Sequence, residues 1–89
     1  MPQVKLYGLF RKHAATSKVD IPGGTVRVVL TTLCAGNQSL CEAIFDENGL
    51  RSHVRVMVNG RDMDLLQGLE TNLTTSDQIA IFPPIAGGS

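Results

Sequence analysis

The chain is long enough for one small domain and carries no net charge. Its 89 residues exclude a second domain, while 43% hydrophobic residues supply one core and 18% charged residues argue against disorder. Eight basic residues balance eight acidic ones, which excludes the electropositive surface that nucleic-acid or polybasic membrane binding needs. No apolar segment approaches the roughly 20 residues that cross a bilayer, and no secretory signal pattern is present, so we expect a cytoplasmic protein.

Alternating apolar residues predict two strands near the N-terminus. The first alternation covers residues 3–10 and ends at Phe10. The polar and basic residues 11–17 predict a turn, and a second alternation predicts a strand over 18–21. We therefore expect an antiparallel hairpin that begins almost at the first residue.

Two helices are predicted after this hairpin. Thr25 is expected to cap the first, because its hydroxyl can accept a hydrogen bond from an unpaired N–H of the first turn. Gly36 is expected to end it in the left-handed conformation, and Ser39 with Glu42 has the spacing of a capping box for a short second helix. The first helix carries an apolar stripe at helical spacing, formed by Val26, Val29, Leu30, Leu33 and Cys34.

The second half of the chain reads as short strands joined by turns. Asn59-Gly60 is the strongest signal, because both residues tolerate the positive φ angles of a type I′ hairpin turn. In order, the expected elements are a turn at 46–49, strands at 53–58 and 61–63, a compact or 3-10 loop at 65–73 whose leucines cover the core, and a strand at 78–82. One main helix among several strands predicts an α+β roll with the helix on one face of a mixed sheet.

The two cysteines do not form a recognisable disulfide or zinc motif. Cys34 and Cys41 lack the C-x-x-C spacing of a zinc ribbon or redox pair. If one helix carried both, their backbones would lie about 10 Å apart, which is too far for a disulfide. We expect two buried free thiols.

No catalytic site of its own is predicted for the chain. The histidines, His13 and His53, have no cysteine or carboxylate at metal-ligand spacing, so surface positions are expected. Asp62 and Asp64 lie beside a hairpin without the apolar surroundings that would raise a carboxyl pKa for acid catalysis. The glycines form neither a dinucleotide-binding nor a Walker phosphate loop.

The C-terminal residues are the remaining candidate for chemistry. An extended segment from Pro83 to Gly88 reaches roughly 20 Å. Gly87 and Gly88 lack Cβ atoms, so their backbone can enter a narrow channel and present a carboxylate to another protein. Pro83-Pro84 stiffens the base of this arm, and the alternative is a frayed terminus without a role.

The sequence resembles the MoaD-type ubiquitin-like sulfur carriers, which include the small subunits of molybdopterin synthase. The resemblance is strongest over residues 45–88, in HVRVMVNGR at 53–61, in the acid-bearing turn at 75–78 and in FPPIAGG at 82–88. It extends in layout to the first strand and to the helix after Thr25. It implies a ubiquitin-like β-grasp domain over residues 1–82 and a flexible Gly-Gly tail over 83–89.

The resemblance implies a function at Gly88. An E1-like enzyme would use ATP and magnesium to adenylate the Gly88 carboxylate, and a sulfur donor of the desulfurase or rhodanese type would convert it to a thiocarboxylate. The acceptor would be the larger subunit of molybdopterin synthase. The chain would thus carry a reactive group without being a catalyst, and no metal or cofactor of its own is implied.

The same resemblance assigns roles to the residues around Gly88. Phe82 would contribute to an apolar docking face on the sheet. Ser89 departs from the pattern, since carriers of this family end at the second glycine; it is removed by a JAMM-type protease, is foreign to the natural chain, or marks a homologue that is not a carrier. The residues that would line partner channels are Pro83, Pro84, Ile85, Ala86 and Gly87.

Other roles remain open from the sequence. Carriers of this type resemble proteins that supply sulfur for cysteine, thiamine or tRNA, and some archaeal ones are joined to lysines as protein modifiers. The ending and the long middle section 37–53 favour the molybdopterin or cysteine type over the thiamine type. A third hypothesis is an interaction module whose tail has no function.

Overall fold

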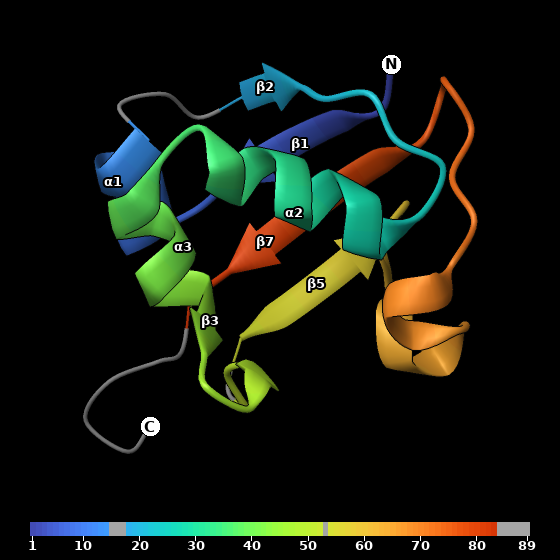
Figure 1. Ribbon diagram of the computed structural model, residues 1–89. Helices are drawn as coiled ribbons and strands as arrows, with labels where there is room; N and C mark the ends of the chain where they lie inside the picture. Colours follow the sequence, from blue (N-terminus) through green and yellow to red (C-terminus); the bar gives the residue numbers. More distant parts are fainter. Residues whose placement is uncertain (15–17, 53, 84–89) are drawn as a thin grey trace.

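A five-stranded mixed sheet lies behind one main helix (Figure 1). The computed structural model describes residues 1–14, 18–52 and 54–83. The first and last strands, β1 and β7, run parallel at the centre, and the other neighbouring strands are antiparallel. Across the sheet the order is β2 (Lys18–Asp20), β1 (Gln3–Leu6), β7 (Gln78–Phe82), β5 (Arg55–Val58) and β6 (Arg61–Asp62).

The first strand is shorter than the alternation predicted. It ends at Leu6, and Gly8 turns the chain with a φ of +59° into helix α1 (Leu9–Ala14). Phe10 is 1% exposed because this helix directs it into the core. The predicted strand to Phe10 and the turn over 11–14 are therefore wrong, while 15–17 lie outside the described residues. The antiparallel pairing of β1 with β2 is confirmed.

Helix α2 (Val26–Ala35) forms as the sequence predicts. The Val28 N–H donates to Thr25 Oγ1 at 3.2 Å, which confirms the N-cap. The apolar stripe faces the sheet, and Leu30 is fully buried. Gly36 is not left-handed: its φ of −90° and ψ of −8° are right-handed, because the chain passes directly into the next helix.

Helix α3 (Gln38–Ile44) is capped by a residue that the sequence analysis overlooked. Asn37 Oδ1 accepts a hydrogen bond from Leu40 N at 3.0 Å. The predicted capping box of Ser39 and Glu42 is therefore wrong, since the helix has already begun at Gln38. A small hairpin follows, formed by β3 (Phe45–Asp46) and β4 (Gly49–Leu50), and this confirms the turn between them.

The β5–β6 turn and the loop after it match most of their predictions. Asn59 and Gly60 have φ angles of +51° and +84°, as the type I′ turn requires. Two 3-10 helices follow, η1 (Met63–Leu65) and η2 (Gly68–Glu70). The leucines cover the core only in part: Leu73 is buried, whereas Leu65 is 79% exposed.

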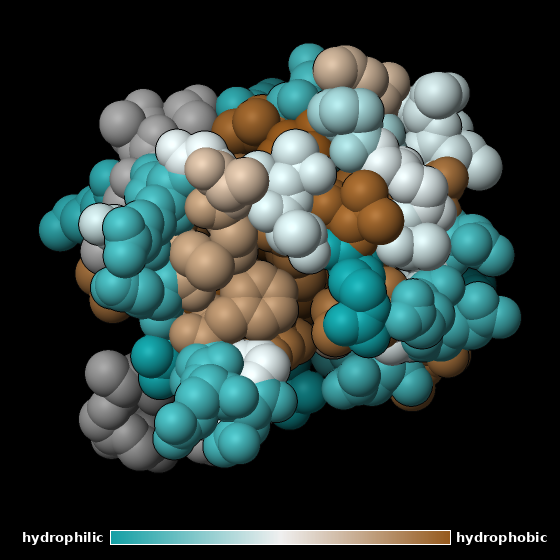
Figure 2. Space-filling model, in the orientation of Figure 1, coloured by the Kyte–Doolittle hydropathy of each residue, from teal (hydrophilic) through white to brown (hydrophobic). Residues whose placement is uncertain are grey.

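The core fills the space between α2 and the sheet. Every second residue of the central strands points into it, including Val4, Val56, Ile79 and Ile81, all at most 1% exposed. On the helix side of the molecule, apolar residues come to the surface over α3 and β3, next to hydrophilic neighbours (Figure 2). Ala43 and Phe45 are half-buried there and pack against the core. The face of the sheet that points away from α2 carries both polar and apolar side chains.

Candidate functional site

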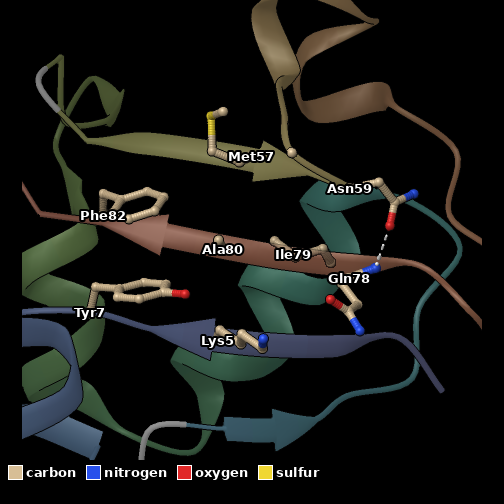
Figure 3. A pocket seen from close by; sticks show the side chains of 9 residues that line it. Lys5, Tyr7, Met57, Asn59, Gln78, Ile79, Ala80 and Phe82 are labelled. Carbon is tan, nitrogen blue, oxygen red and sulfur yellow. Dashed lines mark hydrogen bonds between the residues drawn. The ribbon is translucent and has the colours of Figure 1, made fainter.

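The face of the sheet that points away from α2 forms a pocket. Side chains of β1, β5 and β7 stand on this face, with α2 behind the strands (Figure 3). Strict alternation places them here, because their neighbours along each strand enter the core. The pocket is lined by Lys5, Tyr7, Met57, Asn59, Gly60, Gln78, Ile79, Ala80 and Phe82.

Two aromatic rings form one end of this face. Tyr7 and Phe82 stack with ring centroids 4.5 Å apart and an angle of 12° between the ring planes. They are 39% and 36% exposed, so a large apolar surface stays in contact with water. Phe82 is the last residue of β7, and Pro83 follows it as a half-buried residue. The pair therefore stands where the chain leaves the sheet (Figure 3).

A hydrogen-bond network closes the other end of the pocket. Asn59 Nδ2 donates to Asp77 Oδ1 at 2.8 Å, and Gln78 N donates to Asn59 Oδ1 at 2.9 Å. Thr74 N donates to Asp77 Oδ2 at 2.7 Å. The two bonds that Asp77 accepts lower the pKa of its carboxyl, the backbone bond from Thr74 most and the Asn59 amide next. The network holds the start of β7 against the β5–β6 turn.

The two cysteines lie on different helices, Cys34 on α2 and Cys41 on α3. The estimate of their separation along a single helix therefore does not apply. Both thiols are free and half-buried, so the expected full burial is wrong. Burial raises the pKa of Cys34 to about 12, with further contributions from a hydrogen bond and charge repulsion involving Cys41. Cys34 is thus a protonated thiol at neutral pH.

The carboxylates of the β5–β6 hairpin have structural partners. Asp62 Oδ1 accepts a hydrogen bond from Asp64 N at 2.9 Å, and Asp62 Oδ2 lies 3.6 Å from Arg55 Nη1. This arrangement caps η1 and links the two strands. Among the described residues, no group of three or more His, Cys, Asp or Glu side chains is placed to hold a metal ion.

Most of the other predicted site residues lie outside the described part of the chain. His53 and the tail residues Pro84, Ile85, Ala86, Gly87, Gly88 and Ser89 lie outside the described residues, as does the His13 side chain. Phe82 stands on the pocket face as an exposed residue. The sequence analysis did not select Tyr7, Met57 or Lys5, although their alternation with core residues places them on the same face. No described helix has the length and apolar character to cross a membrane.

Comparisons with known proteins place this chain in a family. The ThiS family matches residues 4–88. Small archaeal modifier protein 3 of Haloferax volcanii is 38% identical over 64 residues, which cover 72% of this chain and 70% of that protein. A putative sulfur carrier protein of Archaeoglobus fulgidus is 31% identical over 80% of this chain and 82% of its own length.

A solved structure shows the same fold. The solution structure of small archaeal modifier protein 1 from Methanosarcina acetivorans superposes with a TM-score of 0.91 and 33% identity, covering 98% of this chain and 95% of that one. The expected mixed sheet, main helix and ubiquitin-like β-grasp fold are thereby confirmed. With 85 consecutive residues matched (4 to 88 inclusive), the chain belongs to the ThiS family, the small ubiquitin-like sulfur carriers of the MoaD and ThiS type.

Proposed function

We propose that this protein carries sulfur as a thiocarboxylate on Gly88. The Gly88 carboxylate attacks the α-phosphate of ATP in an E1-like enzyme that also binds magnesium, and pyrophosphate leaves. A persulfide of a desulfurase or rhodanese-type donor then displaces AMP and forms an acyl disulfide. A second thiol cleaves this disulfide, which leaves the thiocarboxylate on Gly88 and a disulfide between the two thiols. The chain supplies the carrier group, and the partner enzymes supply catalysis.

The observation that carries this proposal is the position of the exposed aromatic pair. Tyr7 and Phe82 present apolar surface at the end of β7, directly before Pro83 and the glycine tail. A partner that covers this face also meets the tail where it leaves the sheet. Aromatic residues contribute strongly to protein interfaces, because their burial removes much apolar area from water at a small entropic cost.

Ser89 must be removed before this chemistry begins. Where Ser89 follows Gly88, the Gly88 carbonyl belongs to an amide bond, so Gly88 has no free carboxylate to adenylate. We propose that a JAMM-type protease hydrolyses this bond. The liberated Gly88 then enters the channel of the partner together with Pro83, Pro84, Ile85, Ala86 and Gly87.

We further propose that the sulfur is delivered to a molybdopterin synthase. The FPPIAGG ending and the long section 37–53 favour this acceptor type, or one that forms cysteine, over the thiamine type. The larger synthase subunit would receive the tail and transfer its sulfur to the cofactor precursor. Delivery for cysteine, thiamine or tRNA follows the same carrier chemistry and differs in the acceptor enzyme.

The test compares two forms of the chain, one ending at Gly88 and one retaining Ser89. Each is incubated with the activating enzyme of its own organism, ATP, magnesium, a persulfide donor and a thiol. We expect the form ending at Gly88 to exchange pyrophosphate and to gain the mass of one oxygen-to-sulfur replacement, and the Ser89 form to do neither. A Gly88-terminated chain that forms neither adenylate nor thiocarboxylate would contradict the proposal.

Attachment to other proteins is a second candidate function. It is favoured by the 38% identity to a protein named as a small archaeal modifier. It predicts higher-mass conjugates that survive reducing agent, with Gly88 in an amide bond to lysine. Because the last basic residue is Arg61, trypsin would leave residues 62–88 on the modified lysine, and mass spectrometry should search for that remnant.

A further inference from the structure

The junction between β1 and α1 supports the beginning of the tail. Tyr7 N donates to Ile81 O at 3.2 Å, and the Tyr7 ring stacks on Phe82. The next residue along, Gly8, packs directly against Pro83. Residues from the beginning of the chain thus contact three consecutive residues at its other end. These contacts fix the backbone at the point where the chain leaves the sheet.

Gly8 allows the closest of these contacts. A Cβ atom at position 8 would lie 2.7 Å from Pro83 Cγ and 3.4 Å from Pro83 Cδ. The first separation is shorter than carbon atoms tolerate, and a proline ring cannot rotate away as the end of a long side chain does. Any other residue at position 8 therefore displaces Pro83. Gly8 also has a φ of +59°, which glycine adopts without steric cost.

Displacement of Pro83 would change the direction in which the chain continues beyond this residue. Proline fixes its own φ and restricts the residue before it, so the Pro83-Pro84 pair transmits the direction set at its base. An extended segment of five residues, the number from Pro84 to Gly88, reaches about 17 Å, and a rotation of about 20° at its base moves its end by roughly 6 Å. Misplacement of a reacting group by even about 1 Å lowers reaction rates strongly.

We propose that Gly8 is a positioning residue that directs the tail, and with it Gly88, into the active site of the activating enzyme. This inference rests on the proposed sulfur-carrier function. Gly8 touches neither ATP nor the reacting carboxylate, and it acts through Pro83. The proposed docking face consists of the Tyr7 and Phe82 rings, and a Cβ at position 8 does not change these side chains. Substitution of Gly8 therefore affects the delivery of Gly88 to the active site more than the binding of the protein to the activating enzyme.

The substitution Gly8→Ala has a closely matched control in Gly68→Ala. Gly68 has a φ of +61°, almost the angle of Gly8, but no atom lies within 4 Å of a Cβ placed there. Both substitutions therefore impose the same backbone strain, and only Gly8→Ala creates the contact with Pro83. Thermal melting of both variants verifies that they fold, and any extra loss of stability in Gly8→Ala reports its contact with Pro83.

The experiment measures pyrophosphate exchange with chains ending at Gly88 and the activating enzyme of the same organism. We expect Gly8→Ala to lower kcat about tenfold while KM stays within about twofold, and Gly68→Ala to change neither. Adding Pro83→Ala to Gly8→Ala removes the ring atoms that clash and should restore part of kcat. Equal kcat values for the two glycine variants would overturn the inference.

A second measurement does not depend on the enzyme. Residual dipolar couplings of Ile85, recorded by NMR in weakly aligned samples, report the orientation of the chain just beyond the proline pair. They should change in Gly8→Ala and stay unchanged in Gly68→Ala. Unchanged couplings in Gly8→Ala overturn the positioning role by themselves, whereas failure of the parent chain to exchange pyrophosphate overturns the proposed function.

Discussion

Asn59 links the β5–β6 turn to residues 77 and 78 through both polar atoms of its side-chain amide. Its nitrogen donates to Asp77, its oxygen accepts from the Gln78 backbone, and its own φ is positive. Asparagine is one of the few residues that adopts this backbone conformation readily. The hairpin turn could be predicted from Asn59-Gly60 alone, but the link to residues 77 and 78 depends on tertiary structure.

We expect Asn59→Ala to lower the free energy of unfolding by about 1 to 2 kcal/mol, because both side-chain hydrogen bonds are lost. Asn48→Ala, at an exposed turn residue, is the control and should cost less than about 0.5 kcal/mol. Urea denaturation measures both values. Equal stabilities for the two variants would show that the amide network contributes nothing.

The raised pKa of Cys34 predicts a pH dependence of stability. Below the usual range of a thiol pKa, Cys34 is protonated in both the folded and the unfolded chain, and it has no effect on pH dependence. As the pH rises toward about 12, the unfolded chain ionises while the folded one holds its proton, so stability falls. We expect urea midpoints between pH 8 and 11 to fall less steeply for Cys34→Ala than for the parent chain. Parallel profiles would contradict the raised pKa.

Among the elements, α2 was the most predictable because its signals are local. A capping threonine and an apolar stripe both lie within one segment, and both appear in the structure. Helix α1 was missed for the opposite reason. Val4, Leu6 and Phe10 fit a strand, and only the turn at Gly8 shows that Phe10 reaches the core from a helix. Periodicity over so few residues does not separate the two cases.

The stripe of α2 should also dominate the energetics of that element. We expect Leu30→Ala to cost about 2 to 5 kcal/mol, because it leaves a cavity between helix and sheet. Val28→Ala, on the same helix but with 46% of its surface exposed, should have a much smaller effect. Thermal or urea unfolding compares the two. A Leu30→Ala chain as stable as Val28→Ala would contradict the packing described for α2.

At the scale of the whole molecule, the proposed docking face combines two residues far apart in the sequence, Tyr7 and Phe82. Phe82 was predictable from its place before the tail, but Tyr7 was not. The register that pairs Leu6 with Ile81 brings the next residues, Tyr7 after β1 and Phe82 at the end of β7, side by side. The parallel pairing of the first strand with the last depends on tertiary structure, and no local pattern of residues predicts it. For that reason the sequence indicated Phe82 but not Tyr7.

We expect Phe82→Ala to raise the KM of the activating enzyme about tenfold with little change in kcat, because it removes apolar docking area but not the support of Pro83. Leu65→Ala is the control, since Leu65 is equally apolar and 79% exposed but lies on η1 away from this face. Steady-state pyrophosphate exchange measures both constants. A KM that rises equally in both variants would remove the special role of the face.

The parallel pairing of β1 with β7 has a consequence for chains that have not yet folded. Tyr7 follows β1 and Phe82 ends β7, which lie far apart in the sequence, so the aromatic pair exists only once these two strands have paired. A chain in which β1 and β7 have not paired carries the glycine tail but lacks the aromatic pair beside it. Under the proposed function, an activating enzyme that requires both the tail and the aromatic pair would spend ATP only on folded carriers, so the fold itself would act as a quality check.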